Sequence, residues 1–345
     1  MSAASIAKPS PPATPLARLA AGLRGFAATP WRLRLAPPAP QAGLEVRAEG
    51  LRLRTRHGDS ASLVRPEALT RLDGLHLNAA DDKALAAALA PFLAQLPRAP
   101  LALLLPTRYF RAFALDLGGE LPKRRSEVDA MLRFRLKRLL PYKPEAARLS
   151  FRPDDAAPGR LLALAAYEPV LRQWEYAIQA CGLSAGWVLP ASFAALAAWR
   201  IDSPDNAPGY GLPETKAKFN PEAIRLLIDS DGAGVNLIAA RGGAPLLLRS
   251  KSLLSGESAA TLAGGEAALT VAYLRDKLHC PRLAGAAVAL PEWRPGSGSP
   301  EFAPLLETLA AAGVAAPEAA PAPLDWIGLP AAAREAKEAA AEAAA

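Results

Sequence analysis

Residues 226–253 read LLIDSDGAGVNLIAARGGAPLLLRSKSL, and this stretch decides the fold. Short apolar runs broken by glycine-containing turns predict antiparallel strands joined as hairpins. The expected elements are, in order, a strand at 224–229, a turn at 230–234, a strand at 235–240, a turn at 241–244 and a strand at 245–249. The first strand ends in an acidic turn, in which Asp229 and Asp231 are followed by Gly232.

A similar arrangement begins near residue 43. Apolar side chains alternate here with charged ones, at Leu44, Val46, Leu51 and Leu53, and a turn at 57–59 leads to a further strand at 61–64. Alternation with a period of two predicts strands with one buried face. Glu45 and Arg47 are among the charged residues of this alternation, and the turn at 57–59 contains Asp59. The sequence therefore predicts two lobes, each opening with a hairpin that ends in an acidic turn.

Strands and helices alternate in the rest of the chain. The expected helices are 81–96, 126–140, 170–181, 191–199, 265–278 and 301–312, and the expected strands are 101–106, 109–117, 147–152, 161–167, 185–189 and 286–290. Ser126 with Asp129 resembles a capping box at the start of its helix, which Pro141 would close. Leu132, Leu136 and Leu139 are expected on the buried side of that helix. This order predicts an α/β fold rather than a helical repeat.

Composition limits the classes that remain. The chain has 345 residues, 51% apolar, with a net charge of +7 from 40 basic and 33 acidic residues, which suits two globular domains. No apolar run approaches the roughly 18 residues that a membrane-spanning helix needs. Cys181 and Cys280 form no CxxC or Cys/His pattern, which argues against a disulfide framework or a structural zinc site and favours a reducing cytosol. Five tryptophans are expected in the core: Trp174, Trp187, Trp199, Trp293 and Trp326.

The ends of the chain and its middle differ from the lobes. Residues 1–42 form a basic, proline-rich arm with five cations and no acid, and a short amphipathic helix is expected within it. A disordered extension and an organellar transit peptide are alternative interpretations of the arm. We expect a first lobe with an inserted subdomain at 43–201, a linker at 202–222, a reduced second lobe at 223–330 and an Ala/Glu-rich tail at 331–345.

Two lobes with acidic, glycine-containing turns facing a shared cleft are the plan of the actin, hexokinase and Hsp70 superfamily. The chain resembles the PilM family of type IV pilus assembly proteins and the related cytoplasmic domain of GspL. The resemblance covers about residues 43–336 and rests on EVDAMLRFRLKRLLPYKPEAARLSF at 127–151, the hairpins at 226–253, and IGLPAAAREA at 327–336. It implies an actin-like, ribonuclease H-like fold with two lobes.

The phosphate-binding turns depart from the pattern of that family. In the first turn, Arg47 stands where the family has glycine, two residues after Glu45. In the second, Asp229 matches, but Asp231 replaces a glycine before Gly232. Glycine lets backbone N–H groups approach a phosphate, and a large or acidic side chain there opposes it. We therefore expect no catalytic residues, no metal site, no ATP or Mg²⁺ cofactor and no enzymatic activity.

Two further departures concern the adenine side of the nucleotide site. Only about fifteen residues separate Arg249 from the helix expected at 265, where relatives insert a subdomain that covers the adenine. Residues 291–294 read PEWR in place of a glycine pair that supports the nucleotide. The alternative function is an active ATPase or sugar-kinase-like enzyme of the same superfamily, which would require intact phosphate turns.

The resemblance implies a cytoplasmic scaffold on the inner face of the bacterial inner membrane, in a type IV pilus or a type II secretion machine. Its partners would be the short cytoplasmic tail of a bitopic PilN-like protein and other components of the machine. The tail would bind in a groove of the first lobe, for which we expect Arg135, Arg138, Leu139, Pro141 and Tyr142.

The cations have alternative interpretations. The arm at 1–42 is expected to contact anionic lipid, with about 1 kcal/mol per basic residue near the membrane. The basic helix around Arg135 is either a solvated face or a surface for acidic partners or lipid headgroups. Nucleic acid is not expected as a partner, because aromatic and basic residues do not alternate as they do on many nucleic-acid surfaces.

Overall fold

The computed structural model describes most of both lobes. The described residues are 40–56, 60–64, 71–73, 76–78, 82–94, 96, 98–118, 121–153, 159–201, 223–241, 244–296, 299–325 and 327. The predictions for the N-terminal arm, the linker at 202–222 and the tail at 331–345 therefore fall almost entirely outside the described residues.

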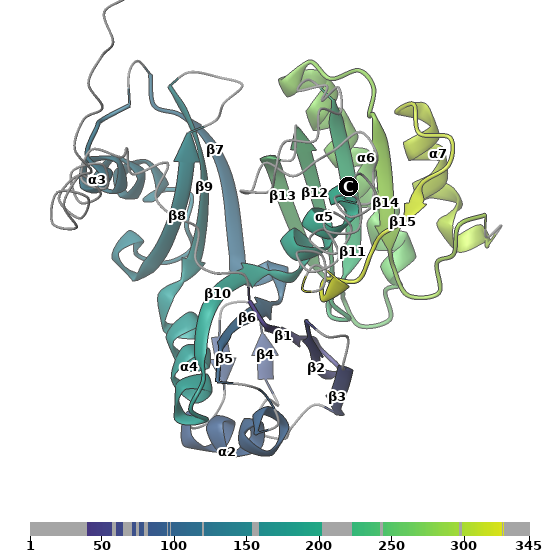
Figure 1. Cartoon of the computed structure of the whole chain (residues 1–345). Coiled ribbons are helices and arrows are strands. Elements are labelled where there is room, and N and C mark those ends of the chain that lie inside the picture. The colour runs from purple at the N-terminus through teal and green to yellow at the C-terminus, as the bar shows by residue number, and fades with distance from the viewer. Residues whose placement is uncertain are drawn as a thin grey trace, which may run out of the picture.

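Two five-stranded sheets share one topology (Figure 1). The first has the order β3-β2-β1-β6-β10 and consists of β1 (Ala42–Val46), β2 (Gly50–Thr55), β3 (Ser60–Val64), β6 (Pro100–Leu105) and β10 (Ser184–Pro190). The second has the order β13-β12-β11-β14-β15 and consists of β11 (Ile224–Ser230), β12 (Gly234–Arg241), β13 (Ala244–Ser252), β14 (Gly285–Ala289) and β15 (Glu318–Ala319).

In each sheet the first three strands pair antiparallel and the last two join in parallel. Tight turns can connect only antiparallel neighbours, whereas parallel neighbours need a longer crossover. The α/β class and the duplicated hairpin plan predicted from the sequence are confirmed.

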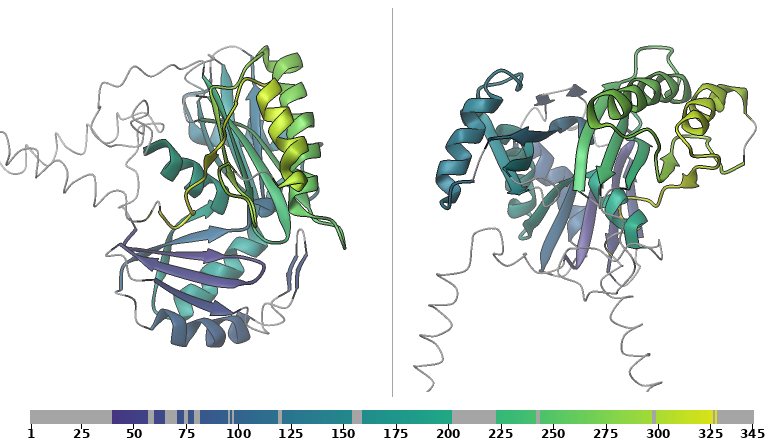
Figure 2. Two further views of the ribbon diagram at one scale, coloured as in Figure 1. Left: turned by 90° about the vertical axis from the view of Figure 1, so that its right-hand side faces the viewer. Right: turned by 90° about the horizontal axis from the view of Figure 1, so that it is seen from above.

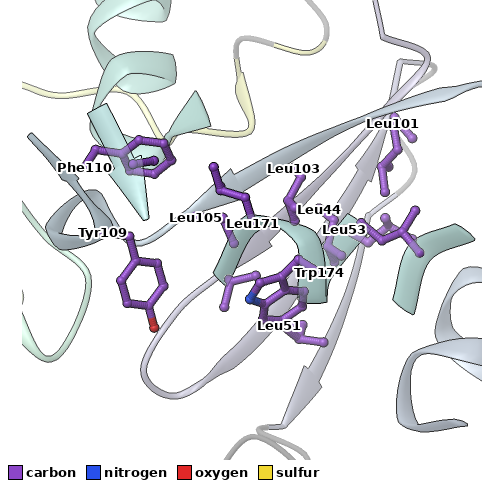
Figure 3. Close-up of a cluster of buried hydrophobic side chains, with 14 of the residues drawn as sticks. Leu44, Leu51, Leu53, Leu101, Leu103, Leu105, Tyr109, Phe110, Leu171 and Trp174 are labelled. Atoms are coloured by element: carbon purple, nitrogen blue, oxygen red, sulfur yellow. The ribbon is translucent and has the colours of Figure 1, made fainter. Parts of the chain in front are cut away.

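Helices cover the sheets and complete the core. They are α2 (Asp82–Leu93) and α4 (Glu168–Ala180) in the first lobe, and α6 (Ala259–Leu278) and α7 (Ala303–Ala311) in the second. Helix α5 (Ala191–Ile201) contacts strands of both sheets (Figure 1). Figure 3 shows Trp174 of α4 among leucines of the first sheet, including Leu44 and Leu51. Trp174 is fully buried, Trp199 and Trp293 are also buried, and Trp187 is half-buried. Trp326 lies outside the described residues.

An inserted subdomain follows β6 of the first sheet. Its antiparallel sheet has the order β7-β9-β8, formed by β7 (Phe110–Asp116), β9 (Arg160–Tyr167) and β8 (Ala147–Pro153). Helix α3 (Arg125–Leu136) packs on this sheet through Val128, Leu132 and Leu136, all fully buried. Figures 1 and 2 place α3 at the outer edge of the molecule, and β7 beside β13 of the second lobe. The small remaining elements are β4 (Arg71–Asp73), β5 (His76–Asn78), η3 (Thr107–Tyr109), η4 (Pro144–Ala146) and η5 (Pro300–Phe302).

The predicted ends of α3 are wrong. The helix begins at Arg125, its N-cap Arg124 makes no side-chain capping bond, and Ser126 is already inside the first turn. The helix ends at Leu136, and a turn follows in which the amides of Leu139 and Leu140 both donate to the Leu136 carbonyl. This turn breaks the helical period, so Leu140 is buried instead of Leu139, which is 52% exposed.

The predicted start of α6 is also wrong. It begins at Ala259 after the N-cap Ser258, whose hydroxyl accepts a hydrogen bond from the Thr261 amide at 3.1 Å. Gly264 and Gly265 therefore lie inside the helix. At Gly264 an added Cβ would come within 3.2 Å of Pro304 Cβ, so the missing side chain lets α7 approach. No helix among the described residues is long and apolar enough to cross a membrane.

Candidate functional site between the two lobes

The two acidic turns touch each other between the lobes. The Ala48 amide, in the turn after β1, donates to the Asp231 carbonyl, in the turn after β11, at 3.1 Å. Gly232 has a φ of +84°, and a Cβ there would lie 2.8 Å from Glu49 Oε2. Glycine at position 232 therefore allows the left-handed backbone conformation, and its missing side chain lets the turn of the opposite lobe approach closely.

Arg47 joins the same two turns through its side chain. Its Nη2 donates to the Ser230 carbonyl across the cleft at 3.0 Å. Its Nη1 lies 3.3 Å from Glu45 Oε1, and its Nε lies 2.8 Å from Glu49 Oε1. The guanidinium group thus takes part in the contact between lobes, and it stands at the position where the resemblance leads us to expect a phosphate-facing glycine.

Asp231 directs its polar atoms to the protein itself. Its Oδ1 accepts the Ala233 amide at 3.0 Å, and its Oδ2 lies 3.6 Å from Arg108 Nη1. The Gly232 amide donates to Ser230 Oγ at 3.2 Å. Two successive N–H groups that an open turn could offer to a phosphate are therefore already paired.

Two buried carboxyl groups line a cavity of about 160 Å³ between the turns. Asp229 Oδ1 accepts a hydrogen bond from Asn236 Nδ2 at 2.9 Å, and burial raises the pKa of Asp229 to about 6. Burial also raises the pKa of Glu45, against the opposing effect of Arg47. Because Glu45 Oε2 has no hydrogen-bond partner among the described residues, this carboxyl group is costly to keep ionised there.

The residues present do not fit Mg-ATP. The turn amides are engaged, and Arg47 lies between the carboxyl ends of β1 and β11. Only residues 253–258 join β13 to α6, which is shorter than the sequence suggested and too short for a subdomain. After β14, Trp293 is buried and Glu292 has a φ of 63°. Within the described ranges, no group of three or more His, Cys, Asp or Glu is placed to hold a metal ion.

The five residues expected to bind a partner lie in the inserted subdomain, away from this cavity. Arg135, Arg138 and Leu139 are exposed, whereas Tyr142 is half-buried, with its ring centroid 4.9 Å from that of Tyr167. Burial raises the pKa of Tyr142 to about 12, and its hydroxyl group has no hydrogen-bond partner in the described part of the chain. Four of the five residues, Arg135, Arg138, Leu139 and Pro141, are thus exposed at the end of α3 and in the turn after it. Tyr142 is half-buried beside Tyr167.

Sequence reasoning missed several residues of the interlobe site. Arg108 follows β6 and reaches Asp231, while Thr107 and Ser192 share a buried hydroxyl pair at 2.6 Å. These residues lie at the carboxyl ends of β6 and β10, beside the carboxyl end of β1. Parallel strands bring their carboxyl ends to one sheet edge, so the polar residues after each apolar run were a usable signal.

Two sheets of one topology, with their acidic turns facing each other, define a two-lobed actin-like fold. In agreement, the chain is similar to the structure of a PilM-PilN type IV pilus biogenesis complex, at 18% identity and a TM-score of 0.57, over 81% of this chain and 88% of that one. The fold is therefore actin-like, of the PilM type.

Two further structures match with lower TM-scores. The cytoplasmic domain of EpsL, an inner membrane component of the Vibrio cholerae type II secretion system, has 12% identity and a TM-score of 0.42 over 78% of this chain and 94% of its own. A Bacteroides thetaiotaomicron protein with an actin-like ATPase fold and unknown function has 11% identity and a TM-score of 0.42 over 80% and 90%. No protein-family model and no curated protein matches the chain.

Proposed function

We propose that this protein is a scaffold of a type IV pilus or type II secretion machine, and that it binds the short cytoplasmic tail of a PilN-like membrane protein without hydrolysing ATP. The observation that carries the proposal is Arg47, which connects the two turns where an actin-like nucleotide site requires open backbone. The PilM-type fold supports the class of machine.

The proposed tail site is the first lobe at the root of the inserted subdomain. There Tyr142 packs against Tyr167 at the end of β9, and the half-exposed rings of this pair offer apolar surface to an extended peptide. Leu139 and Pro141 add apolar surface next to it. Arg135 and Arg138 attract an acidic tail electrostatically, and salt reduces the range of this attraction.

The tail is tested with synthetic peptides covering the cytoplasmic tails of bitopic membrane proteins encoded next to this chain. We expect one peptide to be retained by the wild type and lost with Tyr142→Ala. Tyr176→Ala is the matched control, because Tyr176 is a 52% exposed tyrosine on α4. Failure of every such peptide to bind the wild type would contradict the scaffold proposal.

The absence of ATPase activity is tested by titration calorimetry with Mg-ATP and by a phosphate-release assay. We expect neither binding nor turnover, because the turn amides and Arg47 are engaged within the protein. The double variant Arg47→Gly with Asp231→Gly removes the side chains that occupy both turns, and it is expected to bind Mg-ATP more tightly than the wild type does. Micromolar binding to the wild type would instead favour an ATPase or a sugar-kinase-like enzyme.

The proposed location is the inner face of the inner membrane, where the partner's tail would hold the protein. The basic arm at 1–42 would add affinity for anionic lipid. Deletion of residues 1–39, which leaves all of β1 intact, should reduce co-sedimentation with anionic vesicles at low salt. Unchanged sedimentation would show that the arm does not contact lipid.

A further inference from the structure

The outer face of α3 and the turn after it carry an unusual combination of side chains. Of the seven large apolar residues that are exposed in the described part of the chain, three lie here: Met131, Phe134 and Leu139. Phe134 is 78% exposed, more than any of the others. The ring is therefore accessible to a binding partner, and its burial in an interface would contribute about 1.5–3 kcal/mol.

Unpaired cations surround this apolar ridge. Arg135, Lys137 and Arg138 are exposed and make no hydrogen bond or ion pair within the described ranges. In contrast, Arg133, on the side of the helix toward the sheet, is paired with Asp129. The segment 130–143 contains five basic residues and no acid. The exposed face is therefore strongly positive, with an aromatic ring near its centre.

The position of the helix favours a flat partner. Val128, Leu132 and Leu136 fix one side of α3 to the inserted sheet, so the opposite side points away from the molecule. In the views of Figures 1 and 2, α3 lies at the periphery of the described structure. An apolar ridge flanked by Arg and Lys is the pattern of helices that lie in the interface of an anionic bilayer.

We propose that the outer face of α3 and the turn after it bind the surface of an anionic lipid bilayer, through Met131, Phe134, Arg135, Lys137, Arg138 and Leu139. The ring of Phe134 enters the region between headgroups and acyl chains, and the three cations contact the headgroups. This surface lies apart from the interlobe cleft, and it shares Arg135, Arg138 and Leu139 with the proposed tail site. It would orient the inserted subdomain toward the membrane.

The test uses the full chain and vesicles of phosphatidylcholine with or without phosphatidylglycerol. We expect co-sedimentation with the anionic vesicles only, and release at high salt. Arg135→Gln with Arg138→Gln should weaken partitioning about 30-fold, from about 1 kcal/mol per cation. Lys277→Gln with Arg282→Gln removes two exposed charges from the second lobe and should change partitioning less than about twofold.

A second pair of variants tests the apolar contact. Phe134→Ser should weaken partitioning about tenfold or more, whereas Leu254→Ser, at a 71% exposed leucine of the second lobe, should not. Thermal unfolding of each variant verifies the fold. The proposal would be overturned if both α3 variants bound anionic vesicles as strongly as the wild type does. It would also be overturned if the wild type bound neutral and anionic vesicles equally. If the α3 variants no longer bind the tail peptide but bind vesicles as the wild type does, this surface binds the peptide and not the bilayer.

Discussion

At the scale of single residues, Arg47 determines what the interlobe site can do. Its guanidinium group contacts Glu45 and Glu49 in its own lobe and the Ser230 carbonyl in the other. One charged side chain therefore neutralises buried acid and closes the cleft at the same time. The contact that this arginine makes between the lobes joins protein atoms directly.

Replacing Arg47 with alanine should lower the free energy of unfolding by about 2 kcal/mol or more, because it leaves a buried carboxylate without its cation. Glu45 is only 2% exposed. Arg275→Ala is the control, because Arg275 and Asp276 are both more than half exposed and such surface pairs contribute little to stability. Urea unfolding measures both, and equal stability of the Arg47→Ala variant and the wild type would contradict this role.

Asp229 should make stability depend on pH. Its pKa is raised to about 6 in the folded state by burial, so the folded protein binds this proton more tightly than the unfolded chain. The contribution is favourable at low pH and is lost as pH rises toward 6, by about 1 kcal/mol per pH unit between about 4 and 6. Relative to Asp229→Asn, the wild type should therefore lose stability over this range, as followed by urea unfolding at several pH values. A constant difference between the two proteins would contradict the raised pKa.

At the scale of elements, the limits of the helices depend on local bonds that pattern alone does not reveal. Helix α6 begins where the Ser258 side chain meets the Thr261 amide. Helix α3 begins without such a bond, although Ser126 and Asp129 have the spacing of a cap. Two serines with similar sequence signals therefore have different energetic roles.

Ser258→Ala should destabilise the protein by about 1 kcal/mol, the usual effect of losing an N-cap. Ser126→Ala should leave stability within about 0.5 kcal/mol, because this exposed serine lies inside the helix. Thermal and urea unfolding compare the two variants. An equal loss in both would mean that Ser126 also caps a helix end.

The adjacent glycines of α6 should respond in opposite directions. Gly265 has nothing within 4 Å of an added Cβ, so Gly265→Ala should stabilise the helix by about 0.5–1 kcal/mol. Gly264 faces Pro304 and the Leu305 amide, so Gly264→Val should destabilise the packing of α6 on α7 by more than about 1 kcal/mol. Unfolding midpoints that shift in the same direction for both variants would contradict this packing.

At the scale of the whole molecule, the duplicated sheets bring two turns together that are about 180 residues apart in sequence, as residues 47 and 230 illustrate. The cleft is closed by Arg47 with Ser230, by Ala48 with Asp231 and by Arg108 with Asp231. Each contact joins the first lobe to the second. We infer that the lobes stay closed without nucleotide.

Hydrogen exchange measured by mass spectrometry tests this closure. The double variant Arg47→Ala with Arg108→Ala should exchange faster in both turns, at 43–49 and at 229–234, because it removes the side-chain contacts of both arginines across the cleft and leaves the Ala48–Asp231 backbone bond. Arg172→Ala removes an exposed ion pair of α4 and should change neither turn. Mg-ATP should leave exchange in the wild type unchanged. Protection of the turns by Mg-ATP would contradict ligand-independent closure.

Much of the fold could be predicted from the sequence, but only part of the candidate site. The turn with Asp229 and Asp231 was found because acid and glycine follow a short apolar strand, whereas Glu45 and Arg47 were found through the resemblance to the PilM family. Residues from other strands escaped notice, as Arg108, Ser192 and Asn236 did, because none belongs to a motif of its own. Their role depends on strand order, which brings distant carboxyl ends to one edge.

The sequence by itself determined the two hairpins and the alternation of strands and helices, because both depend on local periodicity. The resemblance to the PilM family marked position 47 as one where an arginine stands in place of a glycine. Only the tertiary structure decided that Arg47 reaches Ser230, that Leu139 is exposed and that Gly264 lies against Pro304. These facts depend on which segments meet after folding. Local propensity cannot specify such contacts, because their partners are far away in the chain.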